Sequence, residues 1–117
     1  MKTTNKDFEL FKQYTAEYIS KLGLVEWSVH LYHGELDGFY ALTDMNSSGM
    51  VATITLSKYW DDLREKSEAQ IQRLALHEVL HLVMNPLLSE AKERYTTPYQ
   101  LEGIEHSIIR RLENTIL

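Results

Sequence analysis

Apolar side chains recur at helical spacing in the first part of the chain. They stand three or four residues apart, as on one face of a helix, and are Phe8, Phe11, Tyr14, Tyr18 and Leu22. Thr4, with Asp7 three residues later, has the pattern of an N-terminal cap, and Gly23 stands where a glycine often ends a helix. The pattern predicts an amphipathic helix over residues 5–22.

The pattern changes to that of β-strands between residues 25 and 56. Three stretches rich in β-branched and aromatic residues, 25–33, 39–45 and 50–56, are separated by the turn sequences "GELDG" and "NSSG". In the third stretch alternate side chains face the same way, and those on the apolar side are Met50, Ala52, Ile54 and Leu56. We expect a small antiparallel three-stranded sheet, connected as a meander, with one buried face.

Helical signals return in the second half. Residues 57–63 predict a short helix or turn. The capping-box sequence "SEAQ" (67–70) opens a helix that should end near Met84, because the residue before Pro86 avoids the α region. A second capping box, "TPYQ" (97–100), has proline at the first helical position and opens a helix that should run nearly to the C-terminus.

The predicted order is helix, three strands, helix, helix, which is typical of an α+β domain. The chain has 117 residues, enough for one modest core, so we expect one domain over residues 1–117. With 44% hydrophobic and 25% charged residues, the composition is that of an ordinary soluble globule.

Charge and cysteine content narrow the classes of partner and site. The net charge of −5 argues against nucleic-acid binding, and no apolar run is long enough for a membrane span or a signal peptide. The chain has no cysteine, which excludes disulfides and fits a reducing cytoplasm, the compartment that we expect. Any metal must therefore be held by histidine and carboxylate groups.

The sequence "HEVLH" (77–81) places two histidines four residues apart in the predicted helix after the sheet. Residues at i and i+4 lie about 6 Å apart along a helix, so His77 and His81 can both reach one Zn²⁺ at about 2.1 Å. Glu78 is placed to take a proton from a zinc-activated water. Apolar neighbours on nearly every side predict that the helix is buried, and buried polar groups need partners, which a metal supplies. The alternative is two core histidines bonded to the backbone.

A catalytic zinc needs a third protein ligand, and the last predicted helix offers Glu102, Glu105 and His106. The apolar stripe of that helix consists of Leu101, Ile104, Ile108, Leu112 and Ile116. On a helical wheel Glu105 lies near the centre of this stripe, Glu102 at its edge and His106 nearer the solvent. A carboxylate in an apolar face needs a partner, so Glu105 is our first choice and Glu102 our second. Alternatively, Glu105 forms a buried salt bridge, with Arg73, Arg94 or Arg111 as candidates.

With His77, Glu78 and His81 on one helix and a glutamate-bearing helix downstream, the chain resembles the zincin metallopeptidases. A glutamate as third ligand makes it similar to gluzincins. The stretches 77–87 and 105–114 are similar to short single-domain zincin-like proteins of phages. The sequence "LEGIEH" resembles the thermolysin-like pattern, which would make Glu102 the ligand and His106 its support. Metzincins have a third histidine at the position of Leu87, so that class is excluded.

The resemblance implies a zinc-dependent metallopeptidase that hydrolyses peptide bonds, with Zn²⁺ as cofactor and Glu78 as general base. It implies a peptide or protein substrate paired with the outermost strand, for which residues 50–56 are the candidate. If the chain is phage-encoded, the compartment is the host cytoplasm. The alternative function is a catalytically inactive zinc-binding interaction module, and a third is a binding protein without metal.

Two further histidines, His30 and His33, lie in the first predicted strand. Residues three apart on a strand face opposite ways, so this pair does not suit chelation. We expect both to be surface or structural residues.

Overall fold

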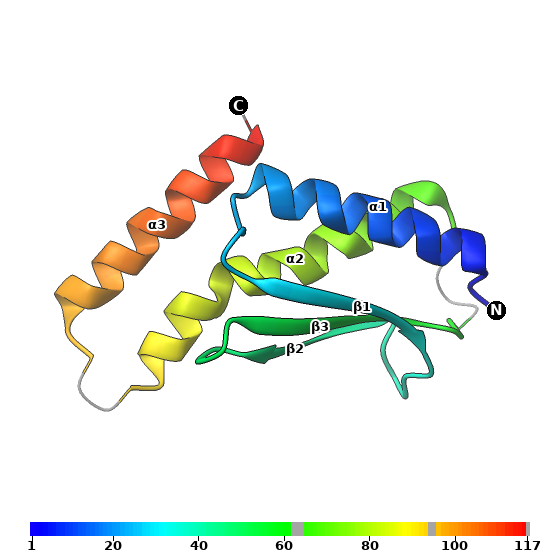
Figure 1. The fold of residues 1–117 in the computed structure, drawn as a ribbon, viewed down its shortest axis with the longest axis horizontal. Coiled ribbons are helices and arrows are strands. Elements are labelled where there is room, and N and C mark those ends of the chain that lie inside the picture. The colour runs from blue at the N-terminus through cyan, green and yellow to red at the C-terminus, as the bar shows by residue number, and fades with distance from the viewer. Residues whose placement is uncertain (62–64, 94–95, 117) are drawn as a thin grey trace.

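The computed structural model describes residues 1–61, 65–93 and 96–116. The elements are α1 (Asn5–Lys21), β1 (Ser28–Gly34), β2 (Ala41–Asn46), β3 (Val51–Ser57), α2 (Glu68–Ala91) and α3 (Pro98–Ile116). α1 and α2 pack against the same face of the three-stranded sheet, and α3 returns from the end of α2 toward the end of α1 (Figure 1). The prediction of an α+β architecture is confirmed.

The sheet is mixed, and the predicted antiparallel meander is wrong. The strand order is β1-β3-β2; β2 and β3 are antiparallel, whereas β1 and β3 are parallel. The turn after β2 is tight: the Asn46 side-chain oxygen accepts hydrogen bonds from Ser48 Oγ at 2.9 Å and the Gly49 amide at 3.0 Å. The segment 35–40 between β1 and β2 is long enough to span two strand spacings, about 10 Å. It therefore carries the chain past the place that β3 later fills.

β3 takes the centre of the sheet because its inner face is the most apolar. Ala52, Ile54 and Leu56 are at most 1% exposed, as the predicted alternation requires. They join two core clusters that also contain side chains of α1 and α2, among them Phe11, Tyr18, Leu74 and Leu82. The binding edge expected at residues 50–56 is therefore wrong, because this strand has a neighbour on both sides. Among the described residues, the unpaired edges of the sheet are those of β2 and β1.

α1 begins and ends as predicted. The Thr4 hydroxyl accepts from the Asp7 amide at 3.1 Å, and the Asp7 carboxylate accepts from the Thr4 amide at 2.7 Å, which is the reciprocal capping box. Gly23 has φ +66°, in the left-handed region that follows a helix end.

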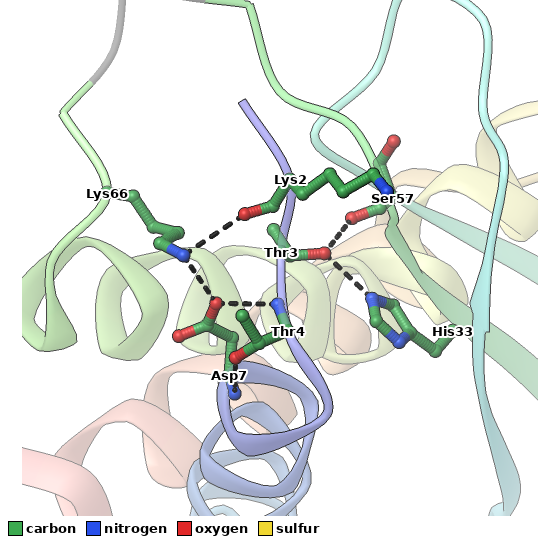
Figure 2. A network of polar contacts seen from close by, with 7 residues as sticks. All are labelled: Lys2, Thr3, Thr4, Asp7, His33, Ser57 and Lys66. Carbon is green, nitrogen blue, oxygen red and sulfur yellow. Dashed lines mark hydrogen bonds and ion pairs between the residues drawn. The ribbon is translucent and has the colours of Figure 1, made fainter.

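The residues just before α1 bind the ends of β1 and β3 (Figure 2). The Thr3 hydroxyl donates to the Ser57 carbonyl at 2.6 Å and contacts His33 Nε2 at 2.7 Å. Because its proton is used, the Thr3 oxygen accepts from His33, whose ring also stacks on Phe8 at 5.0 Å. His33 is thus structural and His30 is exposed, as expected.

The expected helix or turn over 57–63 is not a helix in its described part. Ser57 ends β3, and Tyr59 pairs with Lys2 in an isolated antiparallel bridge. Residues 62 and 63 lie outside the described residues.

α2 continues past Pro86 to Ala91, so the predicted end near Met84 is wrong. Proline inside a helix removes one backbone hydrogen bond and disfavours the helix by about 3 kcal/mol. Tertiary packing offsets this cost of Pro86, because the next residue, Leu87, lies against the core cluster that contains Ile108 of α3.

α3 follows the prediction. The Thr97 hydroxyl accepts from the Gln100 amide at 3.2 Å, Gln100 Oε1 accepts from the Thr97 amide at 2.8 Å, and Pro98 is the first helical residue. Across the described residues, no helix is both long and apolar enough to cross a membrane.

Candidate metal and catalytic site

The structure brings His77, Glu78 and His81 together on α2. One ligand atom from each lies within 4.8 Å of the others, which makes the trio a group able to hold a metal ion. The two imidazole rings lie 5.1 Å apart, at 81° to each other. The pairing of the two histidines on one helical face therefore follows the i, i+4 prediction.

Burial differs sharply within the trio. Glu78 is 4% exposed, whereas the His77 side chain is 67% exposed and His81 is also exposed. The expectation that the helix buries all three is wrong. Its apolar flanks do not surround it, because Met84 and Leu88 share the outer face of the helix with the histidines and are 37% and 46% exposed.

This exposure changes the argument for a metal. Because the two imidazoles are exposed, they need neither a metal nor a backbone group as a hydrogen-bonding partner. Both rings are accessible from solvent, so the interpretation as core histidines is wrong as well. The case for metal binding rests on their position beside a buried carboxylate.

Thr43 of β2 holds Glu78 in place, a contact that sequence reasoning missed. Its hydroxyl lies 3.0 Å from Glu78 Oε1 and 3.4 Å from the Glu78 carbonyl oxygen. The other carboxylate oxygen, Oε2, lies 4.0 Å from His77 Nε2. One oxygen is thus anchored to the sheet and the other faces the histidine. The sequence held one signal for this contact. Thr43 stands in the inward-facing row of β2 with Ala41 and Met45, and a polar group that faces inward needs a partner.

A surface hollow of about 320 Å³ adjoins this group. His77 and Glu78 form part of its wall together with Arg73 and Leu74, and the opposite wall is the segment from Gly38 to Ala41 that leads into β2. The candidate site therefore opens beside the free edge of β2, rather than beside β3.

The glutamates proposed as third ligand lie apart from the histidine pair. Among the described residues, the metal-binding group contains no side chain of α3. Glu102, Glu105 and His106 are exposed, and they line a separate hollow near Leu87. Glu102 and His106 approach each other to 3.8 Å.

The choice of Glu105 assumes that this side chain lies in a buried apolar face of α3. That assumption is wrong, because α3 buries only part of its apolar stripe. Ile104 and Ile108 pack on the core, while Leu112 is 37% exposed and Glu105 lies on the same outer side. A salt bridge of Glu105 to Arg111 is not formed, since Arg111 binds Glu26 at 2.7 Å. Arg94 lies outside the described residues.

The residues fit a zinc ion in their chemistry. Imidazole nitrogens and a carboxylate are donors that zinc accepts. The separation of at most 4.8 Å exceeds the roughly 3.4 Å between two ligand atoms on tetrahedral zinc, a difference that exposed histidines can close by rotating. The structure thus supports a metal-binding group without specifying the metal.

In comparisons with known proteins, no family model, curated protein or solved structure matches the chain.

Proposed function

We propose that the chain is a zinc-dependent metallopeptidase of gluzincin type, in which His77 and His81 hold the metal and Glu78 is the general base. The observation that carries the proposal is the buried Glu78 carboxylate between Thr43 and two exposed imidazoles. When bound, zinc supplies Lewis-acid polarisation of a carbonyl and acidification of water.

Glu78 Oε2 is the atom that accepts the proton from water, because Oε1 is engaged by Thr43. The same oxygen then passes the proton to the nitrogen of the leaving amine, since a carboxyl group near both can act first as base and then as acid. Thr43 acts through Glu78 by fixing the orientation of the carboxylate, and is a positioning residue.

The substrate is an extended peptide that pairs with the free edge of β2. This edge leads directly into the hollow formed with His77 and Glu78, and main-chain pairing at a sheet edge is a common way to bind peptides. β2 thus replaces residues 50–56 as the proposed binding strand.

Glu105 and Glu102 remain the two candidates for the third ligand, and because both are exposed the structure no longer favours Glu105 over Glu102. Ligation by either requires α3 to lie closer to the histidines than it does in the structure. Glu105→Ala and Glu102→Ala should be compared with Glu113→Ala, which removes a third exposed carboxylate from the same helix. Only the substitution that removes the third zinc ligand should weaken zinc binding. Equal zinc affinity in all three variants would show that neither Glu105 nor Glu102 is that ligand.

The first test is the metal content of untagged protein, measured by elemental mass spectrometry. We expect one zinc per chain in wild type and in His30→Ala, and none in His77→Ala. Both histidines are exposed, so neither substitution should disturb the fold. A free zinc concentration of 100 times the dissociation constant should stabilise the protein by about 2.7 kcal/mol. Absence of zinc uptake from micromolar zinc would refute the proposal.

The second test concerns the chemistry. Glu78→Gln keeps the shape of the side chain and an oxygen that can accept from Thr43, but removes the base. We expect it to keep zinc and lose peptide hydrolysis by at least about 100-fold. A variant that keeps both zinc and full hydrolysis would show that Glu78 is not the base.

A second candidate function, a zinc-binding interaction module without catalysis, is favoured by one observation: α3 contributes no ligand to the described group. In that case wild type binds zinc and gains thermal stability from it, yet hydrolyses no peptide, and Glu78→Gln changes neither property.

A further inference from the structure

Arg73 lies one helical turn before His77 and lines the same hollow as His77 and Glu78. It is exposed and, within the described part of the chain, makes no hydrogen bond or ion pair. Arg111 differs, since its guanidinium binds Glu26 at 2.7 Å and the Gly23 carbonyl at 3.1 Å. Arg73 therefore presents an uncommitted cation to whatever enters the hollow.

The hollow offers both polar and apolar surface, with Tyr40 among its other lining residues. Phe39, Ala41 and Leu74 contribute to its walls, and its volume of about 320 Å³ lies at the lower end of the range for small-molecule sites. Glu78 does not compete for the guanidinium, because its two oxygens face Thr43 and His77. The hollow is therefore suited to a ligand with a short apolar chain that ends in a negatively charged group.

The direction of β2 indicates which part of a peptide lies there. Thr43 is level with Glu78, while Phe39 and Ala41 come earlier in the chain and line the hollow together with Arg73 and Leu74. Antiparallel pairing is slightly more stable per residue than parallel pairing, and a peptide antiparallel to β2 runs from Thr43 back toward Phe39. Its residues on the C-terminal side of the cleaved bond therefore enter the hollow.

We propose that Arg73 is a specificity-determining residue that selects substrates with a carboxylate on the leaving-group side of the cleaved bond. A guanidinium matches a carboxylate in a two-point hydrogen-bonded pair. The carboxylate is that of an acidic side chain or the free C-terminus of the peptide. This inference rests on the proposed peptidase function and adds the class of substrate.

The test measures binding without cleavage, in the Glu78→Gln protein. Three pools of fluorescein-labelled peptides share the same randomised positions. The first has a fixed glutamate and an amidated end, the second glutamine and an amidated end, and the third glutamine followed directly by a free carboxylate. Fluorescence anisotropy gives the affinity of each pool. Arg73→Gln is the test variant, and Arg110→Gln, an exposed arginine of α3 outside the hollow, is the matched control.

We expect the first or the third pool to bind about fivefold more tightly than the second, as for an exposed ion pair of about 1 kcal/mol. Preference for the first identifies an acidic side chain, and preference for the third a terminal carboxylate. The preference should disappear in Arg73→Gln, persist in Arg110→Gln and weaken with added salt.

Equal affinity for all pools, binding of none, or a preference that survives in Arg73→Gln would overturn the inference. These outcomes are separate from failure of the proposed function, which is read from hydrolysis by the wild-type protein. Peptide hydrolysis without a carboxylate preference removes only the role of Arg73. Carboxylate-selective binding without hydrolysis removes only the peptidase.

Discussion

Replacing Thr43 by valine removes the hydroxyl that binds Glu78 and keeps the shape of the side chain. The bond is 3.0 Å long, and the Glu78 side chain is only 5% exposed, so water replaces the lost donor poorly. A hydrogen bond to a charged group contributes about 1.5–3 kcal/mol to stability. For a domain near this size, that corresponds to a fall in Tm of roughly 6–12 °C.

A double-mutant cycle measures the interaction energy between Thr43 and Glu78. Glu78→Leu alone should have little effect, because the Thr43 hydroxyl retains the residue 78 carbonyl at 3.4 Å as an acceptor. In the double variant neither partner is left unpaired, so its stability should return close to wild type. The coupling energy should therefore equal most of the loss seen in Thr43→Val.

Urea unfolding, followed by circular dichroism on metal-free protein, gives the four free energies. Thr53→Val, which replaces a threonine on the opposite face of the sheet, is the control and should stay within about 0.5 kcal/mol of wild type. A coupling energy below about 0.3 kcal/mol would refute the claim that Thr43 holds the Glu78 carboxylate.

Two other regions give further predictions. Burial, together with the charge of Lys58, lowers the pKa of His33 below its ordinary value of 6.5. The unfolded chain then binds the proton more readily, so stability is complete above about pH 6.5 and falls as the pH drops below that value. His33→Gln should flatten this decline in urea titrations between about pH 7 and 5, and His30→Gln should not; the same slope in both would contradict the assignment. Gly103→Ala should raise stability by about 0.5–1 kcal/mol, because an added Cβ at this position in α3 has no neighbour within 4 Å. A fall in Tm on calorimetry would show that α3 packs more closely there.

Much of the local structure is predictable from the sequence because it depends on neighbours in the chain. The capping boxes at Thr4 and Thr97 form between residues three apart, and the alternation in β3 fixes which side chains face inward. The spacing of His77 and His81 sets them on one face of α2 in the same way. Each of these features needs only the period of a helix or strand.

Contacts between distant parts of the chain decided the features that the period of a helix or strand does not determine. The placing of β3 between β1 and β2 depends on which strand buries most apolar surface, a competition among residues far apart in the sequence. Packing of Leu87 against the core cluster that contains Ile108 of α3 allows α2 to continue through a proline. The way α3 packs also leaves Leu112 and Glu105 exposed to solvent. Which of two adjacent residues is buried, Glu78 or His77, likewise follows from the side on which the sheet lies. The sequence by itself places the chemical groups on α2; the sheet and α3 determine which of them water and a ligand can reach.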